Sequence, residues 1–304
     1  MDCRCKLCGS VHVKTVYNGK IRNGRLGEYT KSSVPVYQCL NCGVIWHENI
    51  VSDIKQYYES KEYRQSLEGS SEENDFYRKH DGETLDKFQY TGTDIFRKKS
   101  VADIGCGCGA FLDFLKGVAS SIIAIEPSEI YRRIMDEKGF ATYPYTKDAM
   151  RDWAGKVDVT TSFDVIEHVS NPAEFMADVY SLLSYGGQAV IGTPTDAPVM
   201  RRLLGKTYEE KLLFSTQHLW IFSEKNLRNL AQKAGFDKID IKYFQRYGLD
   251  NLLGWLRDKE PCSEIEEAFI TQTLNSVWKS ECSGYGLADY IVIYLKKYES
   301  KKGK

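Results

Sequence analysis

Apolar runs alternate with amphipathic segments over the second two thirds of the chain. From residue 100 onward, short runs rich in Val and Ile alternate with longer segments whose apolar positions recur at helical spacing. This alternation is typical of a parallel sheet flanked by helices. The pattern predicts strands at 101–104, 122–126, 158–165 and 187–192. Two further β-rich runs, "FDKIDIKYF" and "LADYIVIYLKK", predict a pair of closing strands.

Local signals mark where helices begin and end. A glycine-rich loop leads into a predicted helix at 110–116. Asn171 and Pro172 supply an N-cap and a first-turn proline for the segment "NPAEFMADVYSLLS", which we expect to end at the glycine pair 186–187. About forty residues separate the two closing runs. We expect a helical insert there, at about 246–287, that acts as a lid or substrate cover.

The N-terminal part of the chain has a different composition. Residues 1–48 carry five of the nine cysteines and two short β-prone runs, "VHVKTVY" and "VPVYQC", which predict a small hairpin module. Residues 49–98 are polar and rich in tyrosine, and they predict a linker and covering helices. The predicted organisation is therefore a module at 1–48, a linker at 49–98 and a main α/β domain at 99–304.

Composition limits the classes of function. The 304 residues are 42% hydrophobic, and 41 basic residues face 42 acidic ones, so no global field attracts nucleic acid or an anionic membrane. The N-terminal "MDCRCKLCGS" lacks the apolar stretch of a signal peptide, and no run approaches the roughly 18 apolar residues of a membrane span. We expect a cytoplasmic protein whose cysteines are reduced or bind metal.

Four cysteines have the spacing of a metal site. Cys5 and Cys8 form one C-x2-C-G knuckle, and Cys39 and Cys42 form a second about thirty residues later. Four thiolates at the tips of two turns can close a tetrahedral zinc site, and the glycine after each pair permits the turn. The spacing predicts a structural zinc site, because four protein ligands leave no position open for substrate. Cys3 is a spare ligand that could replace Cys5.

The stretch "VADIGCGCGAF" predicts a nucleotide-binding loop. Gly105, Gly107 and Gly109 follow a strand, where they let the backbone turn tightly and approach a ligand. The spacing also satisfies the dinucleotide fingerprint, and in both interpretations Glu126 supplies the ribose-binding acid. Asp103 separates the two, because a carboxylate there is awkward beside a pyrophosphate but favourable beside the ammonium and sulfonium of S-adenosylmethionine.

The run from Asp103 to Gly109 resembles the first motif, D/E-x-G-x-G-x-G, of class I S-adenosylmethionine-dependent methyltransferases. "IIAIEPS" resembles the second strand of that family, "TSFDVIEHVSNP" the fourth strand and its loop, and "GGQAVIGTP" the fifth. The resemblance covers residues 98–245 and implies a Rossmann-like seven-stranded sheet whose last strand is antiparallel. "DVIEHV" and "QHLWIFSEKNLRNLAQKAGF" are most similar to the small-molecule branch, which contains ubiquinone-type O-methyltransferases and sugar methyltransferases.

The glycine loop and the loops after the next strands are the expected cofactor contacts. The resemblance implies that S-adenosylmethionine contacts Asp103, Gly105, Cys106, Gly107, Gly109, Glu126, Pro127, Ser128, Asp164 and Val165. Cys106 and Cys108 are interpreted as small residues tolerated beside glycines, with a redox or metal role as the alternative.

Catalytic candidates lie in two loops. His168 is the candidate base that takes the proton of the acceptor, and Glu167 is a candidate orienter or acceptor contact. The alternative for His168 is a structural role near the start of the next helix. His218, in "STQHLWIFS", is a candidate for the acceptor pocket, and its alternative is a hydrogen bond to a backbone carbonyl.

The insert offers candidate substrate contacts. Arg246, Tyr247 and Asn251, in "QRYGLDNLLGWL", present a mixed polar and aromatic surface suited to a sugar or a nucleotide-sugar. The alternative is an amphipathic helix that only packs its leucines.

The sequence therefore predicts methyl transfer to a small, polar, hydroxylated acceptor, with a sugar nucleotide or a natural-product or polysaccharide intermediate as the expected example. Residues 1–50 carry seven basic and three acidic side chains, so an RNA methyltransferase that docks RNA on the zinc module is the main alternative. A protein-interaction module on an inactive cofactor-binding fold is a third hypothesis. A dehydrogenase is a distant fourth hypothesis. Dehydrogenases have no counterpart of the "DVIEHV" loop or of the paired closing strands.

Overall fold

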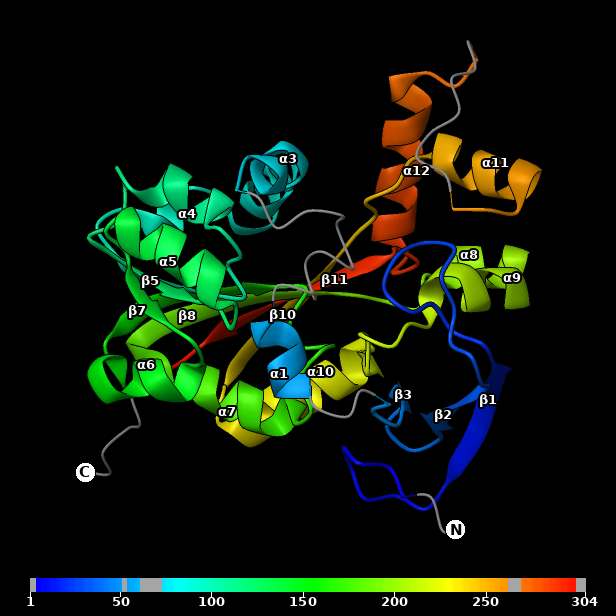
Figure 1. Ribbon diagram of the computed structural model, residues 1–304, viewed down its shortest axis with the longest axis horizontal. Helices are drawn as coiled ribbons and strands as arrows, with labels where there is room; N and C mark the ends of the chain where they lie inside the picture. Colours follow the sequence, from blue (N-terminus) through cyan, green and yellow to red (C-terminus); the bar gives the residue numbers. More distant parts are fainter. Residues whose placement is uncertain (1–3, 51–53, 61–72, 262–268, 299–304) are drawn as a thin grey trace. The chain divides into compact units, whose positions relative to one another are not determined.

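Seven strands form one mixed sheet in the computed structural model, which describes residues 4–50, 54–60, 73–261 and 269–298 (Figure 1). In spatial order they are β10 (Lys238–Phe244), β11 (Tyr290–Lys296), β8 (Leu183–Pro194), β7 (Val157–Phe163), β4 (Ser100–Ile104), β5 (Ser121–Ile125) and β6 (Ala141–Tyr143). β4 pairs in parallel with both β5 and β7.

The pairing of β8 with β11 is antiparallel. Near the start of β8, Gly186 N donates to Lys297 O just beyond the end of β11 (2.8 Å). Just beyond the end of β8, Thr195 N donates to Asp289 O just before β11 begins (3.0 Å). The α/β prediction with a seven-stranded sheet and an antiparallel last strand is confirmed.

The chain folds as two compact units. The first contains residues 1–50, 192–227 and 241–292, and the second contains residues 51–191, 228–240 and 293–304. Neither unit is a continuous segment. The boundaries of these two units differ from the domains predicted at 1–48, 49–98 and 99–304. The division of the chain into these three functional parts stays a prediction.

Helices cover both faces of the sheet in the second unit. α3 (Glu73–Thr91), α4 (Ala110–Leu115) and α5 (Glu129–Glu137) lie on one side, and α6 (Thr146–Trp153) and α7 (Pro172–Leu182) lie on the other (Figure 1). The unit also contains α1 (Ile54–Glu59) and η1 (Asp94–Phe96). One apolar core includes Phe96, Val101, Phe111, Leu112, Leu115, Ala124, Met135 and Val159. This core fixes β4, which leads directly into the glycine loop.

The strand predicted at 187–192 begins earlier in the structure, at Leu183. The Asn171 side chain accepts a hydrogen bond from Glu174 N (3.3 Å), which confirms the N-cap of α7. The helix nevertheless ends at Leu182, and β8 begins at Leu183, which is fully buried. The backbone that follows bonds to the end of β11, and this pairing stabilises an extended chain where the sequence predicts helix.

A four-stranded antiparallel sheet organises the N-terminal part of the first unit. Its order is β1 (Val13–Gly19), β2 (Val34–Cys39), β3 (Ile45–His47) and β9 (Trp220–Ile221). The predicted β1–β2 hairpin is confirmed. β3 and β9 were not predicted, and their register places Ile45 opposite Ile221. The first fifty residues therefore depend on a strand from a remote part of the sequence.

Short helices complete the first unit. They are α8 (Pro198–Leu204), α9 (Lys206–Tyr208), the π-helical η2 (Glu209–Leu213), α11 (Leu249–Asp258) and α12 (Gln272–Gly284). α10 (Glu224–Ala234) connects the two units along the chain. The predicted helical insert contains α11 and α12, and residues 262–268 lie outside the described part of the chain.

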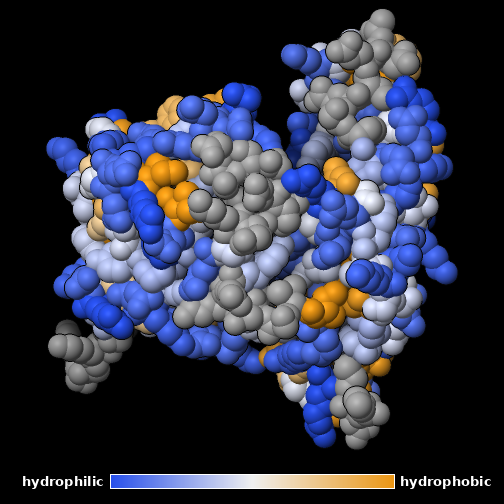
Figure 2. All heavy atoms as spheres, in the orientation of Figure 1, coloured by the Kyte–Doolittle hydropathy of each residue, from blue (hydrophilic) through white to orange (hydrophobic). Residues whose placement is uncertain are grey.

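The exposed surface is mainly hydrophilic on the face shown in Figure 2, where apolar side chains gather only in small areas. Within the described ranges, no helix has both the length and the apolar character that crossing a membrane requires. The seven cysteines of these ranges are all free thiols.

The β3–β9 pairing leads to a test of the first unit. Ile45 is 3% exposed and packs in the core of that unit, so Ile45→Ala should lower the free energy of unfolding by about 2–5 kcal/mol. Val11→Ala is the control, because Val11 is 54% exposed and its truncation should change stability by less than about 0.5 kcal/mol. Urea denaturation followed by circular dichroism measures both, and equal effects would contradict the buried pairing.

Candidate functional site

The loop after β4 requires glycine at three positions. Gly105, Gly107 and Gly109 have φ angles of +78°, +58° and +81°, in the left-handed region that favours glycine. A Cβ atom on Gly105 would lie 2.3 Å from Val165 Cγ2, and one on Gly107 would lie 2.4 Å from Phe76 Cζ. The loop after β7 and helix α3 thus pack directly against bare backbone, which keeps the loop tight.

Glu126 shapes this loop from the neighbouring strand. Its side chain is 4% exposed, and its carboxylate accepts hydrogen bonds from Gly107 N and Ser128 N, both at 3.0 Å. The same carboxylate therefore joins the glycine loop to the start of α5. The predicted ribose acid thus also holds the protein's own backbone.

Asp103 is a second buried carboxyl at this edge of the sheet. It is 2% exposed, and Thr161, its register partner on β7, donates a hydrogen bond to Oδ1 at 2.6 Å. Burial raises the pKa of Asp103, Lys87 and Thr161 act to lower it, and the charge of Glu126 raises it. A cationic ligand would stabilise two neighbouring buried carboxylates, so this pair fits a ligand with an ammonium and a sulfonium group.

The surroundings of the two loop cysteines, Cys106 and Cys108, do not favour a reactive role. Cys106 Sγ lies 3.4 Å from Met135 Sδ in the core, and burial raises the pKa of this thiol well above its usual value. A buried thiol that stays protonated is a poor nucleophile and a poor metal ligand. Cys108 is fully buried, and its carbonyl accepts a hydrogen bond from the Tyr77 hydroxyl of α3 (2.9 Å). This packing supports the interpretation of both residues as small residues beside glycines.

His168 lies between two polar side chains in the loop after β7. Its Nδ1 is 3.0 Å from the Tyr58 hydroxyl of α1, and its Nε2 is 3.8 Å from Glu167 Oε1. Glu167 is 1% exposed, and the preceding Asp164 has a φ angle of +57°, which turns the chain sharply at the end of β7. The sequence offered no specific signal for Tyr58, which was one of many tyrosines in the predicted covering segment.

His218 lies in the first unit, in the loop before β9. Its carbonyl oxygen lies 3.1 Å from Nε2 of His47, which is also 2.9 Å from the carbonyl oxygen of Ser215. The buried His47 therefore holds this loop, a role that sequence reasoning missed. Glu167 and His168 belong to the second unit, and the catalytic role of His218 stays a prediction.

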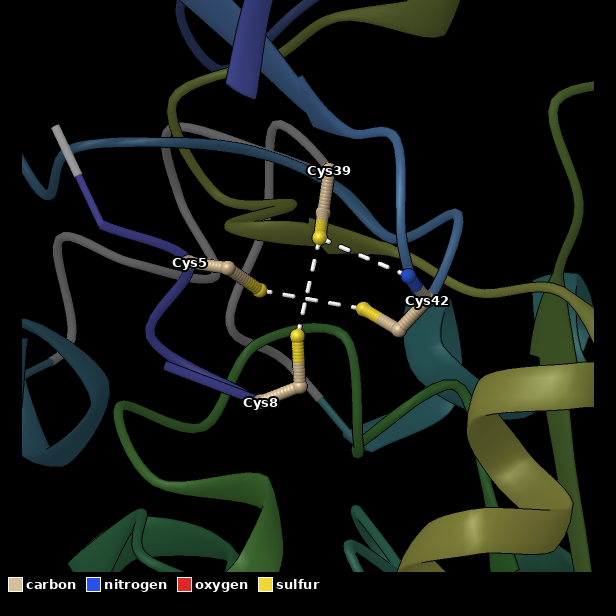
Figure 3. Close-up of side chains that lie close together, drawn as sticks. All are labelled: Cys5, Cys8, Cys39 and Cys42. Carbon is tan, nitrogen blue, oxygen red and sulfur yellow. Dashed lines mark hydrogen bonds between the residues drawn. The ribbon is translucent and has the colours of Figure 1, made fainter. Parts of the chain in front are cut away.

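The four predicted metal ligands lie together (Figure 3). All four Sγ atoms lie within 4.8 Å of one another, with Cys5–Cys42 at 3.7 Å and Cys8–Cys39 at 3.6 Å. Zinc–sulfur bonds of about 2.3 Å in a tetrahedron place sulfurs about 3.8 Å apart. The cluster therefore fits one tetrahedral ion.

The turns that present these thiols have the predicted glycines. Gly9 and Gly43 have φ angles of +74° and +83°, and their amides donate to the carbonyls of Cys5 (2.8 Å) and Cys39 (2.9 Å). Each knuckle is thus a closed turn. Cys3 lies outside the described residues.

Local hydrogen bonds prepare one thiol for deprotonation. Burial acts to raise the pKa of Cys39, but backbone hydrogen bonds from Cys42 and Asn41 and side-chain bonds with Cys8 and Cys42 lower it to about 7. Burial raises the pKa of Cys5. Because metal binding requires thiolates, a cation would have to displace the remaining protons on binding.

A cavity of about 270 Å³ lies within the first unit. Its lining residues are Leu26, Met200, Tyr208, Leu212, Gln245, Tyr247, Gly248, Asn251, Leu252, Trp255, Pro261, Trp278 and Asp289. Tyr247 and Asn251, two predicted substrate contacts, are therefore at the cavity. Arg246 is not; its Nε lies 3.6 Å from Asp289 Oδ1, and its guanidinium lies 4.4 Å from the ring centre of Tyr290.

Comparison with known proteins agrees with this geometry. A family model described as "Methyltransferase domain" matches residues 76–241, more than half of the chain. The ubiquinone biosynthesis O-methyltransferase of Roseobacter denitrificans is 24% identical over 159 residues, which cover 49% of this chain and 64% of that protein. Its counterpart in Actinobacillus pleuropneumoniae is 28% identical over 197 residues, 60% of this chain and 83% of that protein. The chain thus spans less than two thirds of the Roseobacter relative.

Solved structures share the fold. A possible histamine N-methyltransferase from Thermotoga maritima, described as S-adenosylmethionine-dependent, superposes with a TM-score of 0.53 at 19% identity, covering 81% of this chain and all of that one. A methyltransferase from Archaeoglobus fulgidus gives a TM-score of 0.50 at 16% identity, covering 77% and 98%. At these identities the likeness concerns the fold alone.

The Asp103–Thr161 contact can be tested with two adjacent threonines. Thr161→Val removes the hydroxyl that bonds to Asp103 and should lower the free energy of unfolding by about 1–3 kcal/mol. Thr160→Val is the matched control, because the Thr160 hydroxyl is buried without a hydrogen-bond partner among the described residues. Its removal should leave stability unchanged or higher.

The same pair has a pH signature. Because the folded-state pKa of Asp103 is raised, its contribution to stability falls as pH rises from the ordinary carboxyl range through the raised pKa. Thr161→Val removes a contact that lowers this pKa, so the fall should extend to higher pH. Urea denaturation at several pH values measures it. A cost that is the same at every pH, or equal for both variants, would contradict the assignment.

Proposed function

This chain belongs to the methyltransferase-domain family of S-adenosylmethionine-dependent enzymes, and from that membership we propose that it methylates a small, hydroxylated acceptor. The pair of buried carboxylates Asp103 and Glu126 beside the glycine loop carries the proposal, because it suits a cationic cofactor. A sugar nucleotide or a natural-product or polysaccharide intermediate is the acceptor we expect.

We assign cofactor binding to the loops after β4, β5 and β7. Asp103 would face the cationic groups, Glu126 would accept from the ribose hydroxyls, and the backbone from Gly105 to Gly109 would line the site. Pro127, Ser128, Asp164 and Val165 would complete it. When bound, S-adenosylmethionine supplies a methyl group on a sulfonium leaving group.

His168 is the proposed base. If Nδ1–H donates to the Tyr58 oxygen, Nε2 keeps its lone pair and can take the proton of the acceptor hydroxyl as the new carbon–oxygen bond forms. Tyr58 would thus select the tautomer, and Glu167, 3.8 Å from Nε2, would stabilise the imidazolium that results.

The cavity of the first unit favours a small acceptor over RNA. Aromatic and aliphatic side chains make up most of its lining, and a pocket of about 270 Å³ suits a single ring rather than a nucleic acid strand. The N-terminal fifty residues carry seven basic and three acidic side chains. This excess of positive charge keeps RNA as the second candidate acceptor. A gel shift that depends on salt and on residues 1–48 would favour RNA.

We further propose that the four-cysteine cluster holds one structural zinc ion. Its sulfur spacing fits a tetrahedral ion, and four thiolates leave no open coordination position for catalysis.

Native mass spectrometry tests the zinc proposal. The purified chain should carry one zinc per molecule, and Cys8→Ser should lose it because three thiolates remain. Cys3→Ser is the matched control and should retain the ion. Loss of zinc in the Cys3 variant, with retention in Cys5→Ser, would show that Cys3 is the ligand instead.

Binding and turnover separate the roles proposed in the second unit. Glu126→Gln should weaken S-adenosylhomocysteine binding at least about ten-fold, since a carboxylate hydrogen bond is lost. Glu129→Gln, on the exposed side of α5, should not change it. Isothermal titration calorimetry measures both.

His168→Ala should retain that affinity but lower transfer of labelled methyl to acceptors in a cell extract by about 100-fold. Unchanged transfer would remove His168 from catalysis. Cofactor binding by the unaltered chain without any methylated product would instead favour a non-enzymatic role.

A further inference from the structure

The cavity of the first unit has walls of a distinct chemistry. Four aromatic side chains line it, Tyr208, Tyr247, Trp255 and Trp278, together with aliphatic residues from α8, η2 and α11. Among the lining residues that the structure describes there is no lysine, arginine or histidine, and the one charged side chain is Asp289. A phosphate or carboxylate inside the cavity would therefore contact no cationic side chain of this described lining.

The charge of Asp289 is already satisfied by the protein. Oδ1 accepts from the backbone N of Arg246 at 2.9 Å and lies 3.6 Å from its Nε. Oδ2 accepts from Gln245 Nε2 at 3.1 Å and from Tyr247 N at 3.4 Å. With both oxygens occupied and Arg246 alongside, Asp289 provides no open site for a cationic ligand. The cavity thus suits an uncharged guest.

Tyr208 supplies a polar group that the protein does not use. The residue is 6% exposed, its ring packs edge-on against Trp255 with centres 5.5 Å apart, and it lies at the junction of α9 with the π-helical turn η2. Tyr208 lines the cavity, and its hydroxyl makes no hydrogen bond to any residue of the described ranges. Burial raises the pKa of Tyr208, so the group stays a neutral O–H donor. A hydroxyl at a cavity wall without a protein partner can donate its hydrogen bond to a ligand or to water.

The volume sets the size of the guest. A dry cavity of about 150 Å³ accommodates benzene, and pockets for drug-sized ligands begin near 300 Å³. About 270 Å³ therefore holds one substituted ring.

We propose that this cavity binds the methyl acceptor as an uncharged ring, with its faces against the aromatic walls and its oxygen substituent bonded to the Tyr208 hydroxyl. The assignment of this guest as the acceptor rests on the function proposed above. A phenolic ring and the sugar ring of a larger molecule share this chemistry, and any phosphate stays outside the cavity.

Titration of the full-length chain with matched small probes tests the proposal. Acetophenone and methyl β-D-glucopyranoside represent the two uncharged sources, and benzoate and glucose 1-phosphate are their charged counterparts. At least one uncharged probe should bind about ten-fold more tightly than its charged counterpart, and the tighter of the two identifies the source. A charged probe that binds as tightly as its neutral partner, or failure of both neutral probes, would overturn the proposal.

The hydrogen bond of the Tyr208 hydroxyl is tested by comparing a probe that has an acceptor oxygen with one that has none. The unaltered chain should bind acetophenone about five-fold to ten-fold more tightly than toluene, which has no acceptor oxygen. Tyr208→Phe should abolish this difference, whereas Tyr285→Phe, in the same unit and 75% exposed, should preserve it. A merely structural role of Tyr208 would weaken both probes alike, and that result would overturn the assignment of the hydrogen bond.

The two proposals fail in different ways. S-adenosylhomocysteine binding is measured in the same samples, and it should be unaffected by Tyr208→Phe. Ring binding without any cofactor binding would sink the methyl-transfer proposal but keep the cavity, and cofactor binding without ring binding would do the reverse.

Discussion

The burial of two carboxyl groups at the carboxyl edge of the parallel sheet is the constraint on which the second unit depends. A buried carboxylate is costly unless hydrogen bonds or opposite charges satisfy it. Glu126 is satisfied by the backbone amides of Gly107 and Ser128, and this requires the glycine loop to keep its left-handed turns. Asp103 is satisfied in part by Thr161, which sits opposite it because β4 and β7 are parallel neighbours in register. Burial, together with the charge of Glu126, raises the pKa of Asp103, so a cationic ligand would complete the arrangement.

The first unit meets a different constraint, since its N-terminal fifty residues are too few to build a core alone. The cysteine cluster ties two turns together, and strand β9 pairs with β3 from the far side of the sequence. One apolar core then joins residues of both regions, among them Ile21, Val36, Phe214 and Trp255. The cavity draws its wall from the same segments, including Leu26 of the N-terminal part. The cysteine-bearing segment and the cavity are therefore parts of one compact unit.

Motifs that are local in sequence were predictable, and contacts between remote segments were not. The glycine loop, the N-cap at Asn171 and the two cysteine knuckles each place their chemistry within a few residues, so their spacing carries the information. Tyr58 and Thr161 bond to predicted site residues from other elements, and neither stands out from its neighbours along the chain. Arg246 was predicted to face a substrate, and that role stays a prediction; in the structure it lies beside Asp289, more than forty positions away.

The sequence by itself determined the alternation of strands and helices after residue 100, the family motif and the two cysteine knuckles, because backbone propensity, turn chemistry and cysteine spacing are local properties. It also placed Tyr247 and Asn251 on the insert, where the structure finds them lining a cavity. Only the tertiary structure decided that β9 completes the N-terminal sheet, that β8 begins four residues before its predicted start, and that the Tyr208 hydroxyl has no hydrogen-bond partner among the described residues. Each of these depends on which surfaces meet when distant segments pack, and the free energy of that packing belongs to the pair of surfaces rather than to either sequence alone.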